Sequence, residues 1–179
     1  MTVWLRRRAQ ASFIVGMLAV VGGCTGPEIR VSLTPQALKP NPRLAVVSNS
    51  LLADAIGLEL VRYGFTIVER SRLQAVLVEL ELSLSGITRE EDFRKVGEIL
   101  NVDGLVFVGS TFEPHFPSKV GSAMIKIVDV RTGTLAGGVT YQNGRGGLPG
   151  SLADAGTRES LPETARRIAK AIAQGLGRR

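Results

Sequence analysis

Apolar and polar positions along this chain of 179 residues alternate in two periods, one typical of strands and one typical of helices. Short β-prone apolar runs predict strands at residues 43–48, 65–69 and 105–108. Apolar residues spaced three and four apart predict helices at residues 50–62, 71–84, 89–100 and 158–176. Residues 121–143 predict an antiparallel hairpin whose turn contains Gly133, because glycine readily adopts the positive φ that such turns need.

The clearest junction is the one between the second predicted strand and the helix that follows it with almost no loop. Ser71 and Gln74 have the spacing of a capping box at the start of this helix. Thr88 and Glu91 repeat that spacing before the next helix. Both patterns predict helix starts in which a side-chain oxygen satisfies a free backbone N–H group.

The order of the predicted elements is strand and helix, strand and two helices, strand, hairpin and helix. This order predicts an α/β domain, a mixed sheet of about five strands packed with about four helices. Residues 105–108 are apolar on both faces, which favours a central strand that is covered on both sides. One domain over residues 43–179 accounts for the length, and no internal repeat is evident.

Residues 1–23 have the organisation of a secretory signal peptide. Arg6, Arg7 and Arg8 form a basic segment, and residues 11–23 are uncharged and mostly apolar. This apolar run is shorter than the roughly 20 residues that a membrane-spanning helix needs. A permanent membrane helix is therefore the weaker interpretation.

Cys24, the only cysteine, follows at once, and Val21-Gly22-Gly23-Cys24 resembles the lipobox of bacterial lipoproteins. Small residues before the cut let a peptidase approach an extended backbone, and the Cys24 thiol is the predicted site of diacylglyceryl attachment. The alternative is an ordinary cleaved signal peptide with an incidental cysteine. By the same resemblance, the residue after the cysteine influences sorting, and an Asp there would favour the inner membrane. Because this residue is Thr25, the resemblance implies a location at the outer membrane, facing the periplasm.

Residues 24–42 are predicted to form a Pro-rich tether that carries the domain away from the bilayer. The stretch lacks sustained periodicity and contains four prolines, Pro27, Pro35, Pro40 and Pro42. Residues 31–33 allow a short edge strand there, but Pro35 limits its length because proline has no backbone N–H to donate to a neighbouring strand.

Without the signal peptide, 19 basic and 16 acidic residues remain, so the net charge falls from +6 to +3. This excess is small and scattered, and with one Trp and two Tyr there is little aromatic surface for stacking bases, so we expect no nucleic-acid partner. The predicted C-terminal helix and tail are basic, and we interpret them as a solvated face, with anionic lipid or an acidic partner as the alternative. The basic residues are Arg166, Arg167, Lys170, Arg178 and Arg179.

No residue pattern predicts a catalytic, cofactor-binding or metal site. His115 is the only histidine, which argues against a transition-metal site, and a Ser-His-Asp triad would lack the usual Gly-x-Ser-x-Gly turn. The Gly-rich residues 143–156 fit neither dinucleotide nor P-loop spacing and are predicted to be a mobile loop. Glu69, Arg70 and Asp103 lie at strand ends, where α/β ligands often bind, but are interpreted as helix-terminus and turn residues. We therefore expect no enzyme.

Three segments resemble the CsgG/HfaB family of curli assembly and secretion lipoproteins. The first segment is Phe65–Arg70 with Leu73, Glu79 and Leu82–Gly86, the second is Gly97–Ser110, and the third is Ile127–Leu135. The resemblance as a whole covers roughly residues 43–141. The resemblance implies an α/β fold like that of the amino-terminal domain of TolB and of the lipoprotein activators of penicillin-binding proteins. It also makes Glu69 and Arg70 markers of a structural junction.

The chain departs from this family at two places. Curli channels build an oligomeric barrel from two long membrane hairpins per subunit, and here only residues 113–121 and 142–157 stand at the points of insertion. A membrane-crossing strand needs about 9–11 residues, so neither stretch is long enough for a hairpin. The pore activity of the family is therefore not expected.

We expect an outer-membrane-anchored periplasmic lipoprotein that acts as a non-enzymatic binding or assembly accessory in envelope biogenesis or secretion. Its expected partners are the membrane, through acyl chains on Cys24, and an envelope protein that contacts the helices or residues 143–156, while homo-oligomerisation is left open. Two alternatives stay open as well, a subunit of a CsgG-type secretion channel and an activator of a peptidoglycan synthase of the penicillin-binding-protein class.

Overall fold

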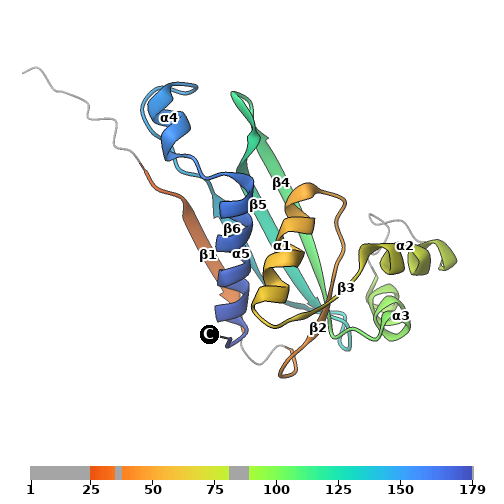
Figure 1. Ribbon diagram of the computed structural model, residues 1–179. Coiled ribbons are helices and arrows are strands. Elements are labelled where there is room, and N and C mark those ends of the chain that lie inside the picture. Colours follow the sequence, from red (N-terminus) through yellow and green to blue (C-terminus); the bar gives the residue numbers. More distant parts are fainter. Residues whose placement is uncertain (1–24, 35–37, 81–88, 179) are drawn as a thin grey trace, which may run out of the picture.

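The computed structural model describes residues 25–34, 38–80 and 89–178, which form one six-stranded mixed sheet with helices against both faces (Figure 1). The strands run in the order β1-β6-β5-β4-β2-β3. Their bounds are β1 Glu28–Leu33, β2 Arg43–Val46, β3 Thr66–Val68, β4 Gly104–Glu113, β5 Phe116–Asp129 and β6 Leu135–Gln142. The helices are α1 Leu51–Arg62, α2 Arg70–Glu79, α3 Glu90–Leu100, α4 Leu152–Thr157 and α5 Leu161–Gly175. The predicted α/β class is confirmed.

The three strands β3, β2 and β4 form the parallel part of the sheet. Leu44 and Ala45 of β2 are both fully buried although they point to opposite faces, as expected of a central strand between two helical layers. Helix α1 connects β2 to β3, and Ser50 caps its start, since the Ser50 hydroxyl accepts a hydrogen bond from the Ala53 amide at 3.2 Å.

The strands β4, β5, β6 and β1 form the antiparallel part of the sheet. The predicted hairpin at residues 121–143 is confirmed, with Gly133 at a φ of 70° in its turn. The Asp129 carboxylate accepts a hydrogen bond from the Arg131 amide at 2.8 Å and so stabilises that turn.

The two faces of the sheet bury separate apolar clusters. On one face, α1 and α5 lie side by side and pack Leu52, Ile56, Ile168 and Ile172 against the sheet (Figure 1). On the other face, α2 and α3 cover only β2, β3 and the first half of β4. The outer face of β5, β6 and β1 carries no helix within the described residues, so the sheet is covered unequally.

The edge strand β1 contains the short strand that residues 31–33 allow and extends it to Glu28–Leu33, so these residues of the predicted tether belong to the sheet. Residues 28–33 pair along their whole length with β6, from Glu28 opposite Gln142 to Leu33 opposite Gly137. Before β1, the Thr25 amide donates to the Arg145 carbonyl at 2.9 Å, and the Arg145 amide donates back at 2.8 Å. Ile29 and Leu33 pack against the α1–α5 cluster, and this alternation of apolar residues outweighs the surrounding prolines.

Two predicted capping boxes have different outcomes from those expected. Helix α2 already begins at Arg70, so Ser71 lies inside its first turn, and the N-cap Glu69 makes no side-chain capping bond. The helix ends at Glu79, earlier than predicted, whereas residues 81–84 lie outside the described residues. Thr88 of the second box also lies outside them, and α3 starts after Arg89 without a side-chain cap. Only Glu69 lies between β3 and α2, so the helix has to begin at Arg70, directly after the strand.

Strands β4 and β5 extend beyond the predicted strand at residues 105–108 and the predicted hairpin at residues 121–143, and they pair with each other as a second hairpin. Pro114 and His115 do not interrupt the pattern but form its two-residue connection, and pairing continues up to Glu113 opposite Phe116. Register shifts after Thr111 and Phe112 absorb the irregularity near the turn. The hairpin therefore projects beyond the helices toward one end of the sheet (Figure 1).

Candidate functional site

Residues 112–120 and 143–158 meet at one end of the molecule, which we call the α4 end (Figure 1). The turn of the β4–β5 hairpin lies against the Gly-rich segment, because a Cβ atom placed on Gly150 would lie 3.3 Å from His115 Cγ. The two stretches at which the family resemblance locates membrane hairpins are thus adjacent in space. Of the four buried charged residues in the described part of the chain, Asp154 and Arg158 lie at this end.

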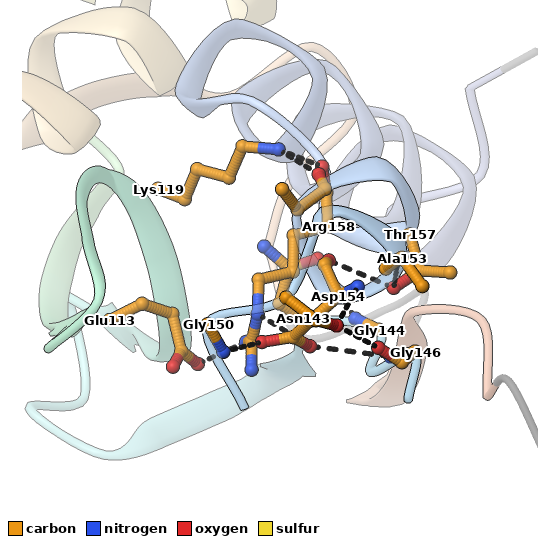
Figure 2. Close-up of polar contacts among 12 residues, drawn as sticks. Glu113, Lys119, Asn143, Gly144, Gly146, Gly150, Ala153, Asp154, Thr157 and Arg158 are labelled. Atoms are coloured by element: carbon orange, nitrogen blue, oxygen red, sulfur yellow. Dashed lines mark hydrogen bonds and ion pairs between the residues drawn. The ribbon is translucent and has the colours of Figure 1, made fainter. Parts of the chain in front are cut away.

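A buried arginine holds the α4 end together. Arg158 is 7% exposed and follows α4 directly. Its Nη1 lies 2.5 Å from Glu113 Oε1 at the tip of β4, and its Nε lies 3.1 Å from Asp154 Oδ1 of α4 (Figure 2). One guanidinium therefore neutralises two carboxylates that come from separate elements.

The carboxylate of Asp154 organises the Gly-rich segment. It is 1% exposed and accepts hydrogen bonds from the Gly150 amide at 3.0 Å and the Gly146 amide at 3.3 Å. The bond from Gly150 is the main reason why the pKa of Asp154 lies below its ordinary value, and Arg158 lowers it further. The segment is thereby folded around a charged side chain.

Asn143 joins this segment to its surroundings with four hydrogen bonds. Its Nδ2 donates to the carbonyls of Val120 at 2.7 Å and Glu159 at 3.1 Å. Its Oδ1 accepts from the amides of Gly144 and Glu159, both at 2.8 Å. Asn143 is only 3% exposed, so water does not reach the backbone groups around it, and its side-chain amide provides their hydrogen-bond partners instead.

The structure therefore corrects the predicted mobile loop at residues 143–156. Besides the bonds of Asn143 and Asp154, the Lys119 ammonium donates to the carbonyls of Ala155 and Arg158 (Figure 2). The glycines serve close packing here, since a Cβ on Gly146 would lie 2.6 Å from the Thr157 side chain and 2.7 Å from the Ala153 carbonyl. A glycine-rich composition is compatible either with a flexible loop or with a backbone that packs closely against neighbouring atoms, and composition alone does not distinguish the two.

A second polar cluster connects β6 to α5 beside the α4 end. The Tyr141 hydroxyl donates to Glu159 Oε2 at 3.1 Å and accepts from the Thr164 hydroxyl, also at 3.1 Å. Burial raises the pKa of Tyr141, so this phenol stays protonated. Arg167 is ion-paired with Glu159, with 2.8 Å between Nε and Oε1, so part of the predicted basic C-terminal face is engaged within the fold.

The C-terminal Arg178 is also used structurally. Its Nη1 donates to the carbonyls of Tyr63 at 3.0 Å and Gly64 at 2.6 Å, and its guanidinium lies 4.4 Å from the centre of the Phe65 ring. Arg166 and Lys170 are exposed on α5, and Arg179 lies outside the described residues. The predicted basic helix is thus solvated only in part.

Two hollows lie away from the α4 end network. One, of about 480 Å³, lies on the uncovered face of the sheet between β1, β6, β5 and β4, where Arg30, Thr111, Met124 and Thr140 are exposed. The other, of about 790 Å³, lies near the carboxyl ends of α3 and α5. Among the acidic residues that line it, Asp103 accepts from the Arg43 amide at 2.7 Å and pairs with Lys39 at 2.7 Å, whereas Glu98 is exposed.

The residues considered for chemistry from sequence are not brought together. Glu69 is the exposed N-cap of α2, and Asp103 is a turn residue, both as interpreted from the sequence. Arg70 is the first residue of α2, and Cys24 lies outside the described residues. His115 is at the β4–β5 turn, where no described carboxylate or hydroxyl bonds its imidazole. Within the described ranges, no group of three His, Cys, Asp or Glu side chains could hold a metal ion.

The outer surface of the α4 end is apolar. Leu148 and Leu152 are 79% and 93% exposed, and Phe112 on the neighbouring hairpin is 43% exposed. Three prolines, Pro114, Pro117 and Pro149, are exposed beside them. Exposed apolar side chains gathered at one end of the molecule make this end a candidate contact surface.

The sequence offered little indication of the residues that build this end. Asp154 and Arg158 have the i, i+4 spacing of a helical ion pair, but α4 is only six residues long and shows no periodicity. Glu113 and Asn143 are distant from both in sequence. Only the folded chain brings the four side chains together.

The described residues thus define a mixed α/β domain in which the buried Asp154 and Arg158 are paired with each other, while the apolar α4 end and one face of the sheet are exposed. No helix in the described part of the chain has the length and apolarity to cross a membrane. Residues 28–114 match the family model of the curli production assembly/transport component CsgG. This match confirms the resemblance over strands β1 to β4 and the helices between them.

Comparison with individually curated proteins finds no significant sequence match. Among solved structures, a PelC dodecamer from Paraburkholderia phytofirmans is similar at 13% identity and a TM-score of 0.48, covering 86% of this chain and 99% of that one. The LpoB C-terminal domain from Salmonella enterica is similar at 14% identity and a TM-score of 0.40, covering 59% and 84%. Lipoprotein GNA1162 from Neisseria meningitidis is similar at 18% identity and a TM-score of 0.41, covering 76% and 99%.

Proposed function

We propose that this protein is a periplasmic lipoprotein, anchored to the outer membrane through Cys24, that binds another envelope protein and assists assembly or secretion without enzymatic activity. The observation that carries the proposal is the match of residues 28–114 to the CsgG assembly and transport component. The pattern of residues 21–24 after a signal-peptide-like segment supports the anchor.

The geometry is consistent with binding rather than catalysis. Charged groups that could act on a substrate, such as Asp154 and Arg158, are buried and paired to hold the fold. The exposed features are the apolar α4 end and the uncovered face of the sheet, and both are surfaces without a convergent set of reactive groups. The connection between β4 and β5 is only Pro114 and His115, so no insertion extends this hairpin.

Membrane fractionation of a Gram-negative host tests the anchor. Wild-type protein should sediment with the outer membrane, and Cys24→Ala should appear in the soluble periplasmic fraction because it lacks the acylated thiol. Thr25→Asp is the matched control, since it keeps the cysteine and should redirect the protein to the inner membrane. Unchanged sedimentation of Cys24→Ala would refute the lipid anchor.

A pull-down from envelope extracts with the lipidated protein as bait tests the binding function. We expect one or more envelope proteins to be retained after washing in salt, and Cys24→Ala should retain them when the extract is solubilised in detergent. Ion conductance in planar bilayers would favour the channel subunit instead. Stimulated transglycosylase activity of a peptidoglycan synthase would favour the activator.

A further inference from the structure

The amino end of the described chain leaves the domain at the α4 end. Thr25 is bridged to Arg145 by two backbone hydrogen bonds of 2.9 and 2.8 Å. Cys24 precedes Thr25 directly, and consecutive Cα atoms are about 3.8 Å apart. An acyl anchor on Cys24 would therefore be attached beside the Gly-rich segment, and residues 28–33 are held in the sheet instead of separating domain and bilayer.

The exposed apolar side chains lie next to this exit point. Leu148 is three residues from Arg145, which is at most about 11 Å along the chain. Leu152 begins α4, and Phe112 reaches the same end from the hairpin whose turn contacts Gly150. Leucines that are 79% and 93% exposed are unfavourable in water and suit the boundary between headgroups and acyl chains.

The charges of the α4 end also suit a bilayer surface. Within residues 112–120 and 143–158 the acidic residues are Glu113 and Asp154, and both are ion-paired with the buried Arg158. Arg145 is exposed at the exit point. The surface therefore presents apolar and basic groups, and no unpaired carboxylate would be repelled by anionic headgroups.

We propose that the α4 end lies on the bilayer, with Leu148 and Leu152 inserted at the depth of the lipid headgroups. This orientation rests on the proposed acylation of Cys24, which would hold the α4 end at high local concentration near the membrane. Apolar side chains inserted beside the acyl chains of Cys24 would add buried apolar area and so strengthen the attachment. The uncovered sheet face then remains accessible to a protein partner.

Fluorescence of a probe at residue 152 tests the contact. Because the acylated Cys24 has no free thiol, Leu152→Cys provides a single reactive cysteine in the mature lipoprotein, which can carry an environment-sensitive dye. Val78→Cys on α2, where the native side chain is 78% exposed, is the matched control, because α2 lies at the other end of the molecule (Figure 1). Both proteins are reconstituted into vesicles of phosphatidylethanolamine with a minor fraction of phosphatidylglycerol that contain nitroxide-labelled lipid.

We expect a blue shift and several-fold stronger nitroxide quenching at residue 152 than at residue 78, and the same result for Leu148→Cys. Co-flotation of the proteins with the vesicles reports the anchor separately. Flotation with equal quenching at both ends would overturn the membrane contact and leave the anchor intact. Loss of flotation would overturn the anchor and the orientation together.

Discussion

Asn143 satisfies several buried backbone groups of the α4 end. Its side chain bonds two carbonyls and two amides that belong to three separate segments. Net stabilisation by one hydrogen bond is modest, but a buried group left without a partner is unfavourable by about 1–3 kcal/mol. Removing this one amide therefore leaves several buried groups unsatisfied at once.

We predict that Asn143→Ala lowers the free energy of unfolding by roughly 2–4 kcal/mol, measured by urea denaturation. The exposed amide of Asn49 offers a control, and Asn49→Ala should change this free energy by no more than about 0.5 kcal/mol. Equal effects of the two substitutions would show that the buried bonds of Asn143 contribute little.

The pKa of Asp154 predicts how stability depends on pH. Because it is lowered in the folded protein, mainly by the Gly150 amide, folding favours the carboxylate over the protonated acid. The stabilisation is present above the unfolded pKa of about 3.9 and is lost as the pH falls through the folded pKa. The difference in unfolding free energy between wild type and Asp154→Asn should thus be constant near neutral pH and shrink in acid. Urea titrations at a series of pH values measure it, and a difference that grows in acid would contradict the assignment.

At the scale of single elements, α3 approaches the sheet more closely than any side chain would allow. A Cβ placed on Gly97 would lie 1.6 Å from Val130 Cγ1. Gly57 of α1 is also buried in a helix, but a Cβ there would meet Val46 and Ile67 at 3.7 and 3.9 Å, which is ordinary contact. The two helical glycines therefore have different reasons to be present.

We predict opposite effects of alanine at these two positions. Gly97→Ala should lower the free energy of unfolding by about 1–3 kcal/mol, because α3 must shift to relieve the overlap. Gly57→Ala should raise it by about 0.5–1 kcal/mol, because alanine favours the helix and fits the available space. Thermal or urea unfolding measures both, and destabilisation by Gly57→Ala would contradict the predicted difference in packing.

Over the whole molecule, the sheet couples two apolar clusters of unequal extent. The larger one lies under α1 and α5, and the smaller one under α2 and α3. Central strands such as β2 contribute to both, since Leu44 belongs to the first cluster and Ala45 to the second. A shared sheet makes independent unfolding of the two layers unfavourable.

We predict that Ile168→Ala lowers the free energy of unfolding by about 2–5 kcal/mol, because it removes a fully buried side chain between α5 and the sheet. Far-ultraviolet and near-ultraviolet circular dichroism should then show one coincident transition, as for the wild type. Leu58→Ala, at a 71% exposed position of α1, is the control and should have little effect. Two separate transitions would indicate that the layers unfold independently.

Much of this fold could be predicted from the sequence because its helices and central strands are determined by local apolar periodicity. The spacing of Leu52, Ile56 and Leu60 identifies the buried face of α1 without reference to any other part of the chain. The likeness to CsgG was recognisable for the same reason, since it rests on the order of such elements. The anchor predicted at Cys24 also depends on a local pattern.

Only the tertiary structure decided what the irregular segments do. Prolines around β1 and glycines in residues 143–156 have compositions typical of a tether and a mobile loop, yet β1 is held by pairing with β6 and the loop by Asn143, Asp154 and Arg158. The pairing of β1 with β6, the bond from Asn143 to Val120 and the ion pair of Arg158 with Glu113 join residues far apart in sequence, so no local pattern records them. The physical reason is that a buried polar group must find a partner wherever the fold brings one, while an apolar face can be read from its own spacing.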